Sequence, residues 1–296
     1  MVSSAAPGGP RLDRRYGRIV NDVIAHFHGR VLIIAPHMDD EVLACGGLIA
    51  LLPDKQRIHV AYATDGMRSP APVLPGRDSI SPDLGALRRA ESEAAMDLLG
   101  VPRANLCFFD LAEGELAGQH GELARRVREH LRRVKPDHVL VPFRFDRHPD
   151  HLAVNRAVTE ALLEGEYRGQ VAEYFVYHRW RLLPAKDIRR YLRPDGLLRL
   201  DIAGVAVQKR AALDCFRTQT TRYYSWQTRP ILTPELLDDE CRGPEYFLRY
   251  DPASPGTRVF TSAATWIRIA HRLEPRLQKW KYVLQTILQR AAGGAR

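Results

Sequence analysis

The sequence predicts an α/β fold: a doubly wound, mostly parallel sheet with helices on both faces. Between residue 30 and about residue 165, short apolar runs alternate with amphipathic segments, which is typical of parallel strands joined by crossover helices. Right-handed crossovers bring the carboxyl ends of such strands to one edge of the sheet. Polar clusters follow two of the predicted strands. The expected fold is therefore Rossmann-like, with its ligand site at that edge.

The apolar runs and the periodic segments define the elements in order. The predicted strands are Arg30–Ala35, Ile58–Ala63, Leu106–Phe109 and His138–Pro142. Apolar residues at three- and four-residue spacing predict the helices that follow them: Glu41–Leu52, Leu84–Leu99, Gly121–Val134 and His151–Leu163. Beyond Gly165 the pattern weakens, and it predicts a strand over Val171–Tyr177, a helix over Val205–Phe216 and an irregular, aromatic region over 218–255.

These patterns divide the chain into three parts. Residues 1–20 are rich in Gly, Pro, Ser and Ala, and we expect them to be flexible. Residues 21–260 form one domain, with a core over 30–165 and an elaboration over 166–260 on the substrate side. Residues 261–296 form a basic amphipathic C-terminal helix, which ends the irregular C-terminal extension of the fold.

The apolar stripe of this terminal helix leaves three alternatives open. Its members recur at helical spacing: Trp266, Ile269, Leu273, Leu277, Trp280, Leu284 and Ile287. Six Arg and Lys residues accompany them, against one acid, Glu274. The helix could pack on its own domain, form a homo-oligomer, or make peripheral contact with an anionic membrane through residues 265–296.

Composition excludes several classes of protein. The net charge is +9, but the arginines of 121–134 lie opposite an apolar helix face, so we expect a solvated surface and no nucleic-acid partner. No apolar run approaches the roughly 20 residues that a bilayer span needs. The four cysteines lack CxxC spacing, and no signal-peptide pattern opens the chain. We expect a cytoplasmic protein, with contact to the inner face of the membrane left open by the terminal helix.

The clusters that follow two strands predict a metal site. His37, Asp39 and Asp40 come directly after the first strand, and His148, Asp150 and His151 come after the fourth. His37, Asp40 and His151 supply two imidazoles and a carboxylate, a set typical of hydrolytic zinc sites with an open position for water. Zinc is therefore the expected cofactor, although iron, cobalt or manganese also suit such a set.

The remaining members of the two clusters predict acid–base chemistry. Asp39 is left free beside the metal, where it can take a proton from the attacking water as general base. His148, held protonated by Asp150, could stabilise the oxyanion or donate a proton to the leaving amine. Glu41 stands in the first helical turn, where a carboxylate also has a purely structural explanation.

The motifs Pro36–Glu41 and His148–His151 resemble those of the LmbE-like, or PIG-L, family of zinc-dependent N-acetylglucosaminyl deacetylases. The resemblance covers residues 30–165 well and returns in Lys209–Leu213 with Thr218-Gln219. It implies that His37, Asp40 and His151 bind zinc, that Asp39 is the general base, and that His148 and Asp150 serve the oxyanion and the leaving group.

The resemblance also implies two substrate contacts, and this sequence departs from the family motifs at two positions. In related deacetylases an arginine at the place of Arg88 and an aspartate at the place of Asp110 touch the sugar; Arg88 could instead pair with Glu91. Met38 replaces the usual proline without displacing a ligand. Asp146 stands where some members have a tyrosine that assists the oxyanion, and we place it on the substrate rim.

Together these observations predict an enzyme that removes acetate from an N-acetylglucosamine unit on a larger aglycone. The expected partner is thus a small-molecule amino-sugar conjugate. The aromatic segment after Thr218 and the loop Ser69–Pro82 are the candidates for aglycone recognition. The alternatives are a metal-dependent amidohydrolase that acts on a non-sugar amide, and a non-catalytic sugar-binding protein of the same fold.

Overall fold

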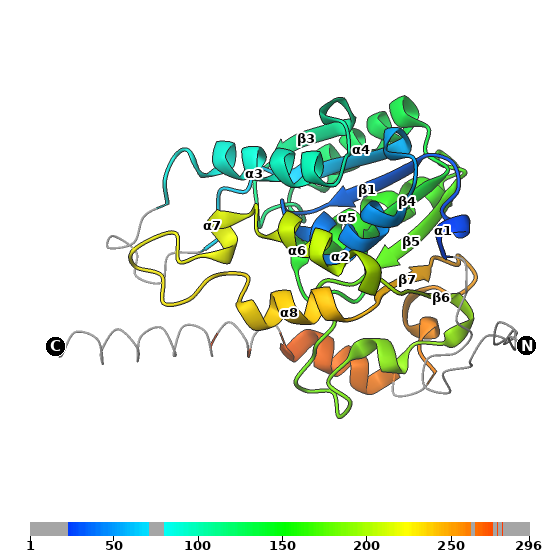
Figure 1. Ribbon diagram of the computed structural model, residues 1–296. Helices are drawn as coiled ribbons and strands as arrows, with labels where there is room; N and C mark the ends of the chain where they lie inside the picture. The colour runs from blue at the N-terminus through cyan, green and yellow to red at the C-terminus, as the bar shows by residue number, and fades with distance from the viewer. Residues whose placement is uncertain (1–22, 71–79, 262–263, 275–276, 278–279, 281–296) are drawn as a thin grey trace, which may run out of the picture.

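The computed structural model describes residues 23–70, 80–261, 264–274, 277 and 280. The predicted flexible segment 1–20 and most of the loop Ser69–Pro82 lie outside these residues. A seven-stranded sheet in the order β3-β2-β1-β4-β5-β7-β6 forms the centre of the protein (Figure 1). Its strands are β1 (Val31–Ala35), β2 (Ile58–Thr64), β3 (Leu106–Leu111), β4 (His138–Pro142), β5 (Gln170–Tyr174), β6 (Leu197–Leu200) and β7 (Glu245–Arg249).

The sheet confirms the predicted mostly parallel fold. Strands β1 to β5 pair in parallel, whereas β7 runs antiparallel to both β5 and β6. The sequence does not predict β6 and β7. Both are short, and they become strands through pairing with β5 and with each other rather than through a local pattern.

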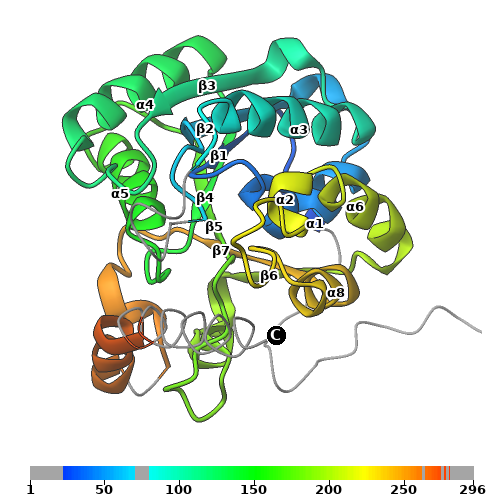
Figure 2. The same ribbon diagram turned by 90° about the vertical axis from the view of Figure 1, so that its left-hand side faces the viewer.

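Helices cover both faces of the sheet, as predicted. Figure 2 shows α2, α3, α6 and α8 on one side of the strands and α4 and α5 on the other. The helices are α1 (Val23–His26), α2 (Asp40–Leu51), α3 (Leu84–Leu98), α4 (His120–Val134), α5 (Pro149–Leu163), α6 (Ala206–Leu213), α7 (Arg217–Thr220) and α8 (Pro234–Arg242). None of the helices that the structure describes is long and apolar enough to cross a bilayer.

The residues of β1 alternate between two hydrophobic cores. Val31 and Ile33 belong to the core under α2 and α6, whereas Leu32 and Ile34 belong to the core under α4 and α5. Because both faces of the central strand are covered, its sequence is an unbroken apolar run rather than an alternating one. This is why the run predicts the strand so clearly.

A third core joins the C-terminal helix to the domain. Ile267 and Ala270, from the helical residues 264–274, pack against a cluster that includes Phe143, Trp180 and Phe260. The inner face of this helix is therefore part of the domain, while the predicted helical residues beyond 280 lie outside the described chain.

A buried ion pair fastens α6 and β7 to the helix that carries Asp40. Lys209 Nζ donates to Leu43 O (2.7 Å) and to Glu245 Oε1 (2.9 Å). Glu245 in turn accepts from the backbone N–H groups of Gly47 (2.6 Å) and Leu48 (2.8 Å) in α2. Lys209 is fully buried, so its ammonium group depends on these partners for solvation.

We expect Lys209→Met to lower the free energy of unfolding by about 3–5 kcal/mol, because it leaves the Glu245 carboxylate buried without its cation. Denaturant unfolding would measure the loss. The matched control is Arg210→Met, which removes a half-exposed cation paired with Asp214 and Asp238 and should cost less than about 1 kcal/mol. Equal losses in the two variants would contradict this account.

Candidate metal centre and active site

The site lies where the order of the strands reverses. Strands β1 and β4 are paired neighbours, but the chain after β1 enters α2 on one face and the chain after β4 enters α5 on the other. The two connections therefore diverge at the carboxyl edge of the sheet, the place where such folds bind ligands. The segments 36–41 and 143–151 meet there, which brings together the two clusters that the sequence singles out.

Three side chains place one ligand atom each at nearly equal separations. His37 Nδ1 and Asp40 Oδ2 are 3.2 Å apart, His151 Nε2 and Asp40 Oδ2 are 3.2 Å apart, and the two ring nitrogens are also 3.2 Å apart. Zinc binds such atoms at about 2.0–2.2 Å in a tetrahedron, which separates them by roughly 3.3–3.6 Å. The set predicted from the sequence therefore fits a zinc ion closely.

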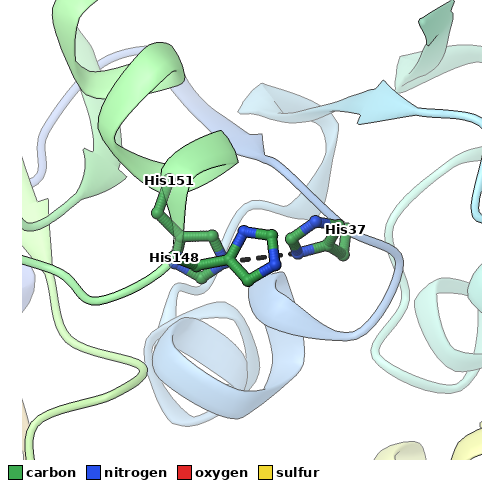
Figure 3. Close-up of side chains that lie close together, drawn as sticks. All are labelled: His37, His148 and His151. Atoms are coloured by element: carbon green, nitrogen blue, oxygen red, sulfur yellow. Dashed lines mark hydrogen bonds between the residues drawn. The ribbon is translucent and has the colours of Figure 1, made fainter. Parts of the chain in front are cut away.

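His148 is the third imidazole at this point, as Figure 3 shows. One nitrogen each of His37, His148 and His151 lie within 4.8 Å of one another, so these three rings form an alternative ligand set. We favour Asp40 over His148 as the third ligand, because its oxygen lies at the same 3.2 Å from both other ligand atoms. His148 is also partly exposed, and its Nδ1 already accepts the backbone N–H of Asp150 (3.2 Å).

A second carboxylate lies behind each of the two inner imidazoles. Asp150 Oδ2 is 3.1 Å from His37 Nε2, and Asp146 Oδ1 is 3.3 Å from His151 Nδ1. Carboxylates placed in this way fix the tautomer of a metal-binding histidine and raise its basicity. Each imidazole thus directs its other nitrogen toward the shared point between His37, Asp40 and His151.

This geometry differs from the expectation for Asp146. Its side chain is buried (2% exposed), and it also accepts the backbone N–H groups of His148 (2.9 Å) and Tyr177 (3.3 Å). It therefore lies inside the loop, against His151, and not on the substrate rim.

The expectation that Asp150 keeps His148 protonated also fails. Asp150 Oδ2 lies 4.0 Å from His148 Nδ1 and is bound to His37 and to the backbone N–H of Gly114 (2.6 Å). Burial, followed by the charges of His37 and His151, lowers the pKa of His148 to about 3. The ring is thus neutral at pH 7, and since Nδ1 accepts a hydrogen bond, Nε2 carries the proton.

Asp39 has an unusual backbone conformation and a buried side chain. Its φ of 151° and ψ of −26° fall in a region that favours glycine, so its position is strained. Among the described residues, no group donates a hydrogen bond to its carboxylate. Burial, and then the charge of Asp40, raises the pKa of Asp39 well above 3.8, which makes it more basic than an exposed aspartate.

Glu41 holds this strained residue in place. Its Oε2 accepts the backbone N–H of Asp39 (3.0 Å), and its Oε1 accepts the hydroxyl of Tyr62 (3.0 Å). Burial raises the pKa of Glu41 to about 8. Of the two explanations for Glu41, the structure supports the structural one.

The family resemblance implies two sugar contacts, and of these Arg88 lies in the interior and Asp110 lies on the surface. Arg88 is 2% exposed and donates to the carbonyl groups of Gly66 (2.9 Å) and Ser69 (2.6 Å). Its carboxylate partner is Glu113 (3.4 Å), not Glu91, which binds Thr218 instead. The exposed Asp110 pairs with Arg89.

Two residues near the site have no counterpart in the sequence prediction. Glu113 is buried, and although burial opposes it, the charges of His37 and Arg88 lower its pKa. The one feature of the sequence that could have indicated Glu113 is its place before Gly114 just past β3, at the same edge of the sheet. Tyr177 follows β5, and its ring centroid lies 5.4 Å from that of His151 and 6.4 Å from that of His148. A single tyrosine after a strand belongs to no recognisable motif, so the sequence does not single out Tyr177.

The C-terminal part of the chain returns to the first cluster. The side-chain amide of Gln219 donates to the carbonyl oxygen of Met38. Met38 is itself buried, and the turn around it keeps His37 and Asp40 in contact. Methionine at the usual proline position therefore leaves the ligand geometry intact, as expected.

Comparison with solved structures defines the class of fold. N,N'-diacetylchitobiose deacetylase from Pyrococcus horikoshii superposes with a TM-score of 0.54 over 75% of this chain and 83% of its own, at 23% identity. The 4-carboxy-2-hydroxymuconate hydratase GalB from Pseudomonas putida KT2440 superposes with a TM-score of 0.52 over 76% of this chain and 97% of its own, at 21% identity. At these identities the likeness establishes the fold alone, and it spans a deacetylase and a hydratase.

Sequence comparison defines the family. The profile of PIG-L, GlcNAc-PI de-N-acetylase, matches residues 32–162. The chain is 32% identical over 211 residues to 2'-N-acetylparomamine deacetylase of Streptomyces fradiae, covering 65% of this chain and 74% of that protein. The protein therefore belongs to the PIG-L family, which confirms the resemblance, and it is a deacetylase, a hydrolase of an N-acetyl amide bond.

The carboxylates behind the imidazoles can be tested by metal affinity. We expect Asp150→Asn and Asp146→Asn each to weaken zinc binding by about 10–100-fold, because His37 and His151 lose the charge that orients them. Competition with a chromogenic chelator would measure this. Asp110→Asn, which alters an exposed aspartate paired with Arg89, should leave the affinity unchanged; an equal loss there would point to a nonspecific charge effect.

Proposed function

We propose that this protein is a zinc-dependent deacetylase of an N-acetylglucosamine-type sugar carried on a larger aglycone. The reaction releases acetate and a free amino sugar. The observation that carries the proposal is the triangle of His37 Nδ1, Asp40 Oδ2 and His151 Nε2, with the carboxylate of Asp39 beside it. The paromamine deacetylase, whose name specifies an N-acetylated amino sugar within a larger molecule, supports the substrate class.

His37, Asp40 and His151 would hold the metal. A bound zinc ion would supply Lewis acidity, lowering the pKa of water and polarising the amide carbonyl. The two imidazoles and one carboxylate match the donor set of hydrolytic zinc sites, and the second nitrogen of each imidazole already faces a carboxylate.

Asp39 would transfer the proton, and His148 would stabilise the developing negative charge. Asp39 accepts a proton from water as the water oxygen bonds to the carbonyl carbon, and its raised pKa suits it to that role. The neutral His148 donates a hydrogen bond through Nε2–H to the oxygen that becomes negative. When the C–N bond breaks, the proton held by Asp39 passes to the amine nitrogen, so that acetic acid and a neutral amine form and Asp39 is ionised again; acetic acid then loses its proton to give acetate.

The outer part of the substrate would contact two segments that the sequence singles out. The hydroxyl of Tyr224 accepts the backbone N–H of Ser81 (2.9 Å), so the end of the loop Ser69–Pro82 touches the aromatic region after Thr218. Tyr224 also stacks on Trp226, with ring centroids 5.1 Å apart and planes 7° apart. We place aglycone recognition where Ser81 meets Tyr224 and Trp226, because aromatic faces and a few polar groups typically line sugar sites.

Tyr177 would be a second donor to the oxyanion. Its ring lies beside His148 and His151 and is 36% exposed, and partial burial, followed by the charges of Asp40 and Asp39, raises the pKa of its phenol above 10. The hydroxyl is therefore protonated at neutral pH and available as a hydrogen-bond donor. It would replace the tyrosine that position 146 lacks.

The test of the function is acetate release from a panel of N-acetylglucosamine conjugates and of N-acyl amino acids. We expect release from the sugars, its loss after chelation and its recovery with zinc. Asp39→Asn should bind zinc normally but lower kcat by about 10²–10⁴-fold, because the proton acceptor is missing. Release from the amino acids alone would favour the non-sugar amidohydrolase, and zinc binding without any turnover would favour a binding protein.

We expect Tyr177→Phe to lower kcat by about 10–1000-fold with little change in KM or zinc affinity, because the hydroxyl acts only when charge develops on the carbonyl oxygen. Steady-state kinetics with the best substrate of the panel would measure it. The matched control is Tyr250→Phe, which removes a hydroxyl from a ring that packs under Arg144 next to Val171 at the start of β5, the opposite edge of the sheet. An unchanged kcat in Tyr177→Phe would exclude the phenol from the reaction.

A further inference from the structure

The helical residues 264–274 have two unlike faces. The inner face carries Ile267, Ala270 and Glu274, which are at most 1% exposed. On the outer face, Trp266 (48%), Ile269 (42%) and Leu273 (45%) are exposed. Leu277 (54%) and Trp280 (75%) extend this apolar stripe at the same helical spacing. Packing on the domain thus accounts for one side of the helix and leaves the larger side chains in solvent.

The charges on this helix are divided between the same two faces. Arg268 and Arg272 are exposed beside the stripe. The acid, Glu274, is turned inward, where it accepts the backbone N–H groups of Arg181 (2.8 Å) and Leu182 (3.0 Å). Among the described residues of the helix, the outer face therefore carries large apolar groups and cations without an acid. The sequence adds Arg276, Lys279 and Lys281 to this stretch.

These charges decide between two possible occupants. A second copy that docked with the same face would bring the arginines of one copy close to those of the other, since a symmetric dimer pairs a surface with itself. Like charges held close together oppose such an interface. An anionic bilayer complements both features, because its headgroups attract the arginines and its acyl boundary receives Trp, Ile and Leu.

We propose that the outer face formed by the helical residues 264–274, together with Leu277 and Trp280, is a docking surface for an anionic lipid bilayer. The helix lies in the plane of the headgroups, with Ile269 and Leu273 in the acyl boundary and Trp266 and Trp280 at the interface, where tryptophan is enriched. The helix does not cross the bilayer. This inference concerns binding alone and does not depend on the proposed reaction.

The docking surface is attached directly to the loop of the second cluster. His271 Nε2 lies 2.7 Å from the carbonyl oxygen of Asp146, and Arg147 lies 3.5 Å from Glu274. The side chain of Asp146 faces His151 at the metal site. A protein bound through this helix thus holds its active site close to the membrane surface.

The full-length protein should sediment with vesicles of phosphatidylcholine and phosphatidylglycerol, and much less with phosphatidylcholine alone or at high salt. Leu273→Glu and Ile269→Glu should each lower the partition coefficient by at least about tenfold, since each removes an apolar group and adds a repelled charge. Val207→Glu makes the same change at an exposed site on α6 and should have no effect. The double variant Arg268→Glu/Arg272→Glu should also lose binding, whereas Arg168→Glu/Arg193→Glu, at exposed sites elsewhere, should largely retain it.

Several outcomes would overturn the proposal. The full-length protein could fail to bind the anionic vesicles, or it could bind them equally well with glutamate at 269 or 273. A dimer in sedimentation velocity that Leu273→Glu dissociates would assign the stripe to a second copy. Thermal unfolding of each variant shows whether the fold is retained, and acetate release from a soluble substrate separates loss of docking from loss of catalysis.

Discussion

The pairing of β1 with β4 is the constraint on which the site depends. These two strands are adjacent, yet the helices that follow them cover opposite faces of the sheet. The connections must therefore diverge, and two motifs separated by more than a hundred residues of sequence meet at the point of divergence. The long-range geometry of the centre is thus set by backbone pairing, and only the last few ångströms are set by side chains.

Buried charge is the second organising feature. Asp40, Asp146 and Asp150 surround His37 and His151, and the carboxylates of Asp39 and Glu41 lie next to this group. Such a concentration of carboxylates would be unfavourable in a dry interior without matching positive charge. Histidine protons or a dication can supply that charge, and a dication at the shared point of the three ligand atoms neutralises the group while leaving both imidazoles neutral.

The sequence predicts what is local and periodic. The interval Glu41–Leu52 corresponds to α2 and His151–Leu163 to α5, because long amphipathic or buried segments determine their own structure. It does not predict β6 and β7, which depend on partners. At the site, the two motifs identify the ligand atoms, but which carboxylate faces which imidazole is decided by tertiary contacts. For that reason Asp146 and Asp150 make other contacts than expected, and the sequence does not predict Glu113 and Tyr177 near the site.

The strained backbone at Asp39 has a consequence for protein engineering. A non-glycine residue in such a conformation costs on the order of 1–3 kcal/mol, and glycine would relieve that cost without disturbing the hydrogen bond from its N–H group to Glu41. A redesign that ranks sequences by folding stability would therefore choose glycine at this position. It would deliver a more robust protein without the carboxylate that we propose as proton acceptor, so position 39 must be held fixed in any stabilisation of this scaffold.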